Sequence, residues 1–172
     1  LGHNHPEIVE AIGRACREVM HLLSWLLAPP VIELCRELAD LLPPSLGKVM
    51  LVSTGGESNE AALRMAKLYT GRFEVVALTG SYHGLTAGAG AVTYAAGRRG
   101  YGPAVPGTLA VPAPNCYRCP IRHCRDRCDL TCLEVGFELV DGQSVGSLAA
   151  FIVEPIISAG GVLVPPPGYF PR

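Results

Sequence analysis

The chain has 172 residues, of which 49% are hydrophobic and 17% charged, a composition typical of a globular domain with a buried core. Its formal net charge is −1 and it has no basic run, so we do not expect it to bind nucleic acid. The longest apolar stretch, residues 20–35, is interrupted by Ser24 and Pro29 and is too short to cross a bilayer. Since no signal-peptide pattern opens the chain, we expect a cytoplasmic protein with no membrane partner.

Two helices are predicted in the N-terminal quarter of the chain. Pro6 suits the first turn of a helix whose apolar residues share one face: Ile8, Ile12, Ala15 and Val19. A second helix is expected over residues 31–42, where the prolines that follow end it. The chain opens on "LGHNHPEIVEAI" and stops at "VPPPGYFPR", and both stretches read as interior sequence, so we expect a part of a longer protein.

From residue 48 onward, apolar strands are expected to alternate with helices. Strands are predicted over residues 48–53, 74–80, 108–114 and 148–156. A helix is predicted over residues 57–69, with Gly71 as its C-terminal end. A second helix is predicted after the Gly/Ala-rich loop that begins at residue 81, and a third over residues 133–141. This alternation predicts an α/β fold with a mostly parallel sheet, in which the apolar run at 148–153 is typical of a strand covered on both faces.

Two consecutive glycines stand where the first predicted strand meets a helix, in "STGGESNE" (residues 53–60). Thr54 and Glu57 have the spacing of a capping box, which closes a helix without any ligand. Gly55 and Gly56 also allow a ligand to approach the N–H groups and the positive end of the helix dipole, where phosphates bind. The spacing leaves both interpretations open, and the two are compatible.

Two further strand ends carry residues that suit a ligand site. Tyr82 and His83 follow the strand at 74–80, and α/β folds bind ligands at the carboxyl ends of their strands. Taken alone, however, these two residues are better explained as a buried aromatic residue and a satisfied histidine. Glu154 ends the apolar strand at 148–156, where a buried carboxylate needs a hydrogen-bonding partner, either in a site or in a loop.

Four stretches together resemble the class III pyridoxal-phosphate aminotransferases in order and spacing: "LGHNHPEIVEAI", "VSTGGESNEAALRMAKL", "SYHGLTAGA" and "FIVEPIISAGG". Within that family the chain looks most like the 2,2-dialkylglycine decarboxylases. The resemblance implies the α/β large domain of a fold type I pyridoxal-phosphate-dependent transferase, incomplete here, and a homodimer or higher homo-oligomer. It implies that residues 1–44 form a helical segment linking to the small domain and that residues 45–172 are a partial cofactor-binding large domain.

The resemblance assigns cofactor contacts to residues already singled out. Thr54, Gly55 and Gly56 match the loop that binds the phosphate of pyridoxal 5′-phosphate. Tyr82 matches the aromatic residue that stacks on the cofactor ring, and His83 follows it in the family motif.

Three more positions are assigned in the same way. Glu154 matches the buried glutamate near the cofactor, and Ser158 is the candidate substrate contact. Ala159 stands where many ω-aminotransferases have a gating glutamate, which the decarboxylases also lack. The segment "HLLS" resembles the decarboxylase segment that binds an alkali metal ion, through Ser24 and the Leu22 carbonyl, although a helix end capped by a serine explains it equally well.

The lysine that forms a Schiff base with this cofactor has no counterpart in the chain. Lys48 precedes the first predicted strand and Lys67 lies in the helix after the glycine pair, whereas the family's lysine lies well downstream. We therefore expect no catalytic residue in this chain and no activity from it alone.

Five of the seven cysteines lie within residues 115–132, an insert relative to the decarboxylases. Their spacing could hold a zinc ion through four thiolates: Cys116, Cys119, Cys124 and Cys128. Because the second half lacks a paired C-x2-C, free thiols in a surface excursion are favoured over zinc, and a disulfide is least expected in the cytoplasm.

Three functions remain open from the sequence. The first is decarboxylation-dependent transamination, in which an amino group passes to a keto acid such as pyruvate; Ala159 and the segment at 21–24 favour it. The second is an ordinary class III ω-aminotransferase with another amine substrate, which Tyr82 and the cysteine insert favour. The third is a truncated, non-enzymatic remnant that binds a metal or a partner through the insert, which the missing lysine favours.

Overall fold

The computed structural model describes residues 2–23, 25–95, 100, 102–121 and 127–172 of the chain. It divides the chain into two compact units, Leu1–Leu51 and Val52–Arg172. Within the described residues, no helix combines the length and the apolar character needed to cross a bilayer.

The first unit contains the two predicted helices. Helix α1 spans Pro6–Glu18 and α2 spans Pro29–Leu41, each with proline in its first turn, and a short 3-10 helix, η1, follows at Pro44–Leu46. Neither α1 nor α2 buries a residue, and apolar side chains such as Ile12 and Val31 stay about half exposed. Such apolar faces are typical of helices that pack against further protein.

The strand predicted over residues 48–53 is wrong. Residues 48–52 have no regular secondary structure, and the side chains of Met50, Leu51 and Val52 are exposed. A strand needs a neighbouring strand to satisfy its backbone, and none of the described residues pairs with this segment. Its apolar sequence alone therefore does not make it a strand.

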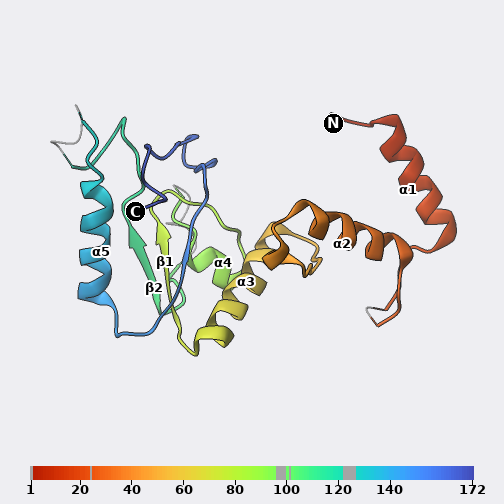
Figure 1. Cartoon of the computed structure of the whole chain (residues 1–172), viewed down its shortest axis with the longest axis horizontal. Coiled ribbons are helices and arrows are strands. Elements are labelled where there is room, and N and C mark those ends of the chain that lie inside the picture. The colour runs from red at the N-terminus through yellow and green to blue at the C-terminus, as the bar shows by residue number, and fades with distance from the viewer. Residues whose placement is uncertain (1, 24, 96–99, 101, 122–126) are drawn as a thin grey trace. The chain divides into compact units, whose positions relative to one another are not determined.

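The second unit alternates helices and strands as predicted (Figure 1). Its elements in chain order are α3 (Gly55–Thr70), β1 (Glu74–Leu78), α4 (Ala87–Ala91), β2 (Thr108–Val111), α5 (Thr131–Gln143) and β3 (Leu148–Ile152). Gly71 ends α3 in the left-handed conformation with φ 66°, as the sequence predicts. The described strands form a parallel three-stranded sheet in the order β2-β1-β3.

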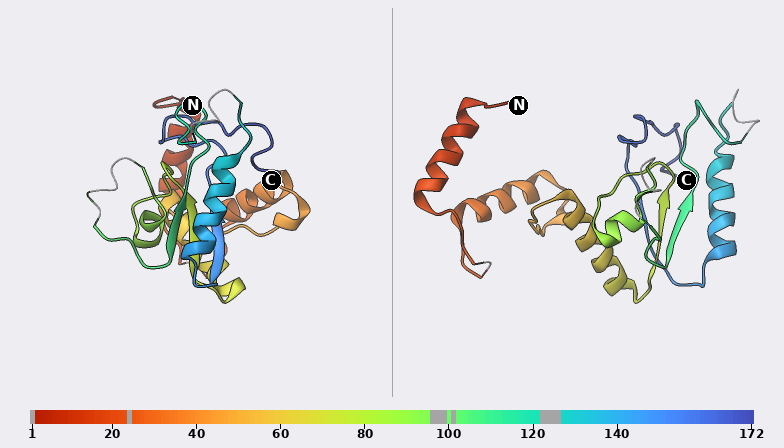
Figure 2. Two further views of the ribbon diagram at one scale, coloured as in Figure 1. Left: turned by 90° about the vertical axis from the view of Figure 1, so that its left-hand side faces the viewer. Right: turned by 180° about the vertical axis from the view of Figure 1, so that it is seen from behind.

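Helices cover both faces of this sheet. Figures 1 and 2 show α5 on one face and α3 with α4 on the other. Alternate residues of β1 feed the two cores: Val76 packs on the α5 side, and Val75 packs with Leu63 of α3. Every residue of β1 is buried, whereas Phe151 of β3 is exposed. The strand expected at 148–153 meets both cores, with Val153 against the α5-side core and Ile152 against the α3-side core, but β3 lies at the edge of the described sheet and is less buried than β1.

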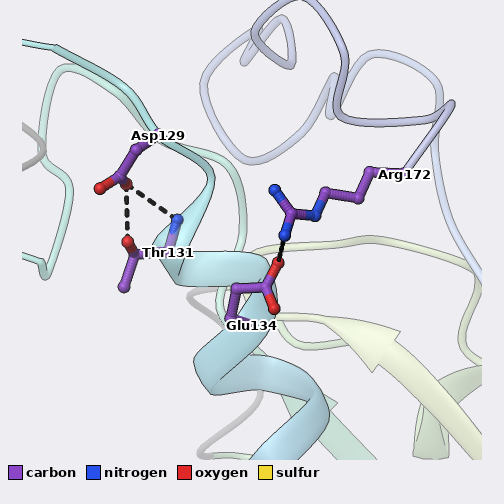
Figure 3. Close-up of polar contacts among 4 residues, drawn as sticks. All are labelled: Asp129, Thr131, Glu134 and Arg172. Atoms are coloured by element: carbon purple, nitrogen blue, oxygen red, sulfur yellow. Dashed lines mark hydrogen bonds and ion pairs between the residues drawn. The ribbon is translucent and has the colours of Figure 1, made fainter.

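The start of α5 is held by its own loop and by the last residue of the chain (Figure 3). An Asp129 carboxylate oxygen accepts hydrogen bonds from the Thr131 N–H at 3.0 Å and from the Thr131 hydroxyl at 2.7 Å. Arg172 pairs with the Glu134 carboxylate at 2.6 Å. These contacts fix the loop before α5 and the C-terminal segment to one helix end.

Candidate cofactor site

The N-terminus of α3 is closed by the predicted capping box. The Thr54 hydroxyl accepts a hydrogen bond from the Glu57 N–H at 3.1 Å, and the Glu57 carboxylate accepts one from the Thr54 N–H at 3.2 Å. The Ser58 N–H donates to the Thr54 carbonyl at 3.0 Å. Among the hydrogen bonds of the described residues, none uses the N–H of Gly55 or Gly56. The cap therefore leaves two donors at the positive end of a 16-residue helix.

The loop after β1 lies directly against this helix end. Gly84 has φ +131°, and a Cβ placed on it would lie 2.7 Å from the Gly56 Cα and 3.2 Å from the Ala89 Cβ. Both the backbone conformation and the close approach therefore require glycine at position 84. At Gly56, by contrast, an added Cβ would meet only ordinary contacts, the nearest at 3.7 Å.

Two adjacent side chains of α3 bind the same loop. The Asn59 amide donates to the His83 carbonyl at 2.6 Å. A Glu60 carboxylate oxygen accepts from the Gly88 N–H at 2.6 Å and from the Ala89 N–H at 3.2 Å. Hydrogen bonds, the strongest from the Thr86 side chain, lower the pKa of Glu60 against the opposing effect of burial. Neither Asn59 nor Glu60 is among the residues predicted for the site, although both precede the buried Leu63 by three or four residues and so share its face of the helix.

His83 is buried, with 5% of its surface exposed. Its backbone N–H donates to the Thr93 hydroxyl at 2.9 Å, while its ring Nε2 is buried without a hydrogen-bonding partner among the described residues. Burial lowers the pKa of His83, and the nearby Glu154 carboxylate opposes that shift. The imidazole is therefore neutral at pH 7, with one ring nitrogen unsatisfied.

Glu154 joins the loop after β1 to the segment after β3. One of its carboxylate oxygens accepts from the Tyr82 N–H at 2.7 Å and the other from the Ser158 N–H at 3.0 Å. These bonds supply the partner that the sequence analysis required for a carboxylate at this position. Tyr82 itself is 42% exposed, so it is not the buried core residue that the alternative interpretation expected.

These features surround an open hollow of about 610 Å³, here named the α3 hollow. Its lining residues are Thr54, Gly55, Gly56, Asn59, Tyr82, His83, Gly84, Leu85 and Thr86. The structure thus brings together every residue that the sequence analysis assigned to the phosphate and the ring. Glu154 and Ser158 do not line the hollow, but the Glu154 carboxylate accepts hydrogen bonds from the Tyr82 N–H of its lining and from the Ser158 N–H.

Neither lysine of the chain lines the α3 hollow. Lys67 lies twelve residues beyond Gly55 on α3, about 18 Å along the helix axis at 1.5 Å per residue. Lys48 is exposed and belongs to the first unit. The described site therefore provides binding groups and no lysine nucleophile.

The residues predicted for metal ions do not form a site in the part of the chain that is described. Ser24 and Cys124 lie outside the described residues, and Leu22 is exposed in the first unit. Cys119 is buried, whereas Cys116 and Cys128 are exposed. Partial burial and the Cys128 thiol raise the pKa of Cys116, which favours its protonated form. No group of His, Cys, Asp or Glu side chains among the described residues is arranged to hold a metal ion.

The fold is that of the fold type I pyridoxal-phosphate-dependent transferases. The chain matches the crystal structure of an (S)-enantioselective omega-transaminase from Thermomicrobium roseum with a TM-score of 0.88 and 32% identity, over 99% of this chain and 40% of that one. It matches the taurine:2-oxoglutarate aminotransferase of Bifidobacterium kashiwanohense, solved with PLP and glutamate, with a TM-score of 0.87 and 30% identity, over 99% of this chain and 40% of that one.

The sequence gives the family. Residues 1–172 match the family model "Aminotransferase class-III". An uncharacterized aminotransferase from Schizosaccharomyces pombe is 50% identical over 170 residues, which cover 98% of this chain and 38% of that protein. The chain therefore belongs to the class III aminotransferase family, which confirms the resemblance found in its motifs. It spans about two-fifths of the length of the curated relatives it matches.

Proposed function

We propose that the intact protein is a pyridoxal 5′-phosphate-dependent aminotransferase that moves an amino group between small amino acids and keto acids. One observation carries the proposal: two helix N–H donors without partners among the described residues, an exposed tyrosine and a neutral buried imidazole meet around one hollow. Membership of the class III family and the PLP-bound relative support the choice of cofactor.

The residues around the α3 hollow fit this cofactor. The N–H groups of Gly55 and Gly56 and the dipole of α3 suit a phosphate. The Thr54 hydroxyl accepts the capping bond and keeps its own hydrogen to donate. Tyr82 offers an exposed ring to a flat heteroaromatic group, and His83 offers its unsatisfied Nε2.

When bound, pyridoxal phosphate withdraws electrons from the substrate carbon that carries the amino group. Glu154 holds the backbone of Tyr82 and of Ser158, and so orients the loop that would contact the ring. The neutral His83 adds no positive charge to the site, and its Nε2 can form one hydrogen bond with a ligand. Since neither lysine lines the hollow, we propose that the chain alone binds the cofactor's phosphate and ring without catalysing transfer.

A charge at the helix end tests this function. A Cβ at Gly55 would meet no atom of the described residues within 4 Å, so the backbone leaves room for the first side-chain atom of both Gly55→Asp and Gly55→Asn. Asp suits a helix N-terminus but repels a phosphate, whereas Asn is its neutral match. In the intact protein we expect Gly55→Asp to bind pyridoxal phosphate at least tenfold more weakly than Gly55→Asn, at similar thermal stability. Equal affinities of the two variants would contradict the proposed site.

Decarboxylation-dependent transamination is the second candidate, and Ala159 favours it because the gating glutamate is missing. We propose that the intact protein converts 2-aminoisobutyrate and pyruvate into acetone, CO2 and alanine. Transamination of other amines without CO2 release would instead identify an ordinary ω-aminotransferase. An alkali-ion site with contacts from Leu22 and Ser24 is proposed only with this candidate, and replacing K+ by Na+ in the same assay tests it. Light scattering of the intact protein tests the proposed homodimer.

A further inference from the structure

The segment from His83 to Ala89, here named the 83–89 loop, consists of the loop before α4 and the first residues of α4, and is attached to α3 at three points. At its start, the Asn59 amide donates to the His83 carbonyl at 2.6 Å. At its end, the Glu60 carboxylate accepts the N–H groups of Gly88 and Ala89 at 2.6 and 3.2 Å. Between them, Gly84 approaches the backbone of Gly56 so closely that an added Cβ would lie 2.7 Å from its Cα.

A buried side chain, that of Thr93, holds the same loop as well. The Thr93 hydroxyl accepts the His83 N–H at 2.9 Å and lies 3.0 Å from the Gly84 carbonyl. Thr93 has no exposed surface. The peptide units on either side of His83 are therefore fixed between Asn59 and Thr93, and their position cannot change without breaking a buried hydrogen bond.

Asn59 connects the two halves of the α3 hollow. It lies one helical turn beyond Gly55, the residue to which the proposed function assigns the phosphate, and its amide holds the carbonyl of His83, the residue next to Tyr82. Two binding groups held at a fixed spacing favour a ligand whose two parts are joined at that spacing, because the second contact then costs little further ordering.

We propose that Asn59 is a positioning residue that sets the spacing between the Gly55–Gly56 donors and the Tyr82 ring, and that Glu60 secures the far end of the same loop. The inference rests on the proposed function. It assigns to this pair the preference of the site for a phosphorylated pyridine over its separate parts.

The test uses the intact protein and three probes: pyridoxal 5′-phosphate, pyridoxal and inorganic phosphate. Asn59→Leu keeps the size of the side chain and removes the donor without adding charge. We expect the ratio of dissociation constants, pyridoxal over pyridoxal phosphate, to fall about tenfold, since one partly buried hydrogen bond is lost. The affinity for inorganic phosphate stays unchanged because the end of α3 is intact. Gln143→Met is the matched control, since the Gln143 amide also donates to a backbone carbonyl, at Leu139, on exposed α5 surface.

An unchanged ratio of the two dissociation constants in Asn59→Leu would overturn the inference, whether both affinities stay the same or both fall equally, because a structural defect alone would weaken both ligands equally. If the wild-type protein does not bind inorganic phosphate and does not bind pyridoxal phosphate more tightly than pyridoxal, the proposed function itself fails. Should Asn59→Leu not fold, Glu60→Gln provides a second measurement. We expect it to lower the ratio of the two dissociation constants by a smaller factor, and an unchanged ratio would contradict the proposal.

Discussion

Replacing Gly84 by alanine should loosen the contact on which the α3 hollow depends. The new Cβ would lie 2.7 Å from the Gly56 Cα and 3.2 Å from the Ala89 Cβ. Ordinary contacts between carbon atoms are about 3.5–4.0 Å, so the loop and the helix end must separate by about 1 Å. The backbone at φ +131° is also one that only glycine adopts without strain.

The expected cost follows from these two effects. A strained backbone costs about 1–3 kcal/mol, and overpacking costs about 1–3 kcal/mol. The smaller entropy of the unfolded alanine chain returns about 0.4–1 kcal/mol. We therefore expect Gly84→Ala to lower the free energy of unfolding by about 1–6 kcal/mol, a large share of a typical domain's stability.

Urea unfolding of the intact protein measures this cost, with cofactor affinity measured alongside. Gly142→Ala is the matched control, because an added Cβ there meets no atom within 4 Å in helix α5. It should stabilise the protein by up to about 1 kcal/mol. The reasoning is refuted if Gly84→Ala unfolds at the same urea concentration as Gly142→Ala and binds pyridoxal phosphate as tightly.

Three further predictions concern the groups around the hollow. Burial lowers the pKa of His83 below its ordinary 6.5. The stability that depends on a neutral ring is therefore fully present above pH 6.5 and is lost as the pH falls toward the lowered pKa. His83→Gln should flatten that part of the stability profile, and an unchanged slope would contradict the buried neutral ring. Glu60, whose pKa is lowered from 4.5, stabilises the fold above that pH and loses this effect as the pH falls through the lowered value. Glu60→Gln should therefore be less stable at pH 7 and less sensitive below pH 4.5 in thermal unfolding, which a parallel profile would disprove. Glu154→Gln keeps one acceptor for the two N–H groups at Tyr82 and Ser158 and should weaken pyridoxal phosphate binding about tenfold. Glu134→Gln, at the surface pair with Arg172, should leave that affinity unchanged, and equal effects of the two variants would contradict the role of Glu154.

Local signals in the sequence predict much of the second unit. The Thr54–Glu57 spacing gives the capping box, Gly71 gives the end of α3, and the alternation of elements gives the parallel sheet. Each of these depends on residues that are neighbours in the chain, or on a period that a single sequence contains.

Contacts between distant residues could not be predicted in this way. Asn59 binds a carbonyl 24 residues away and Glu60 an N–H 28 residues away, and nothing in a single sequence pairs those positions. The strand predicted over residues 48–53 fails for a related reason, since strand formation depends on a partner strand that local sequence does not specify.

A crystal structure of the intact protein with pyridoxal 5′-phosphate tests the central claim most directly. We expect the phosphate oxygens to lie within hydrogen-bonding distance of the N–H groups of Gly55 and Gly56, with the pyridine ring stacked on Tyr82. A phosphate bound away from the N-terminus of α3, or a cofactor ring that does not contact Tyr82, would contradict the account.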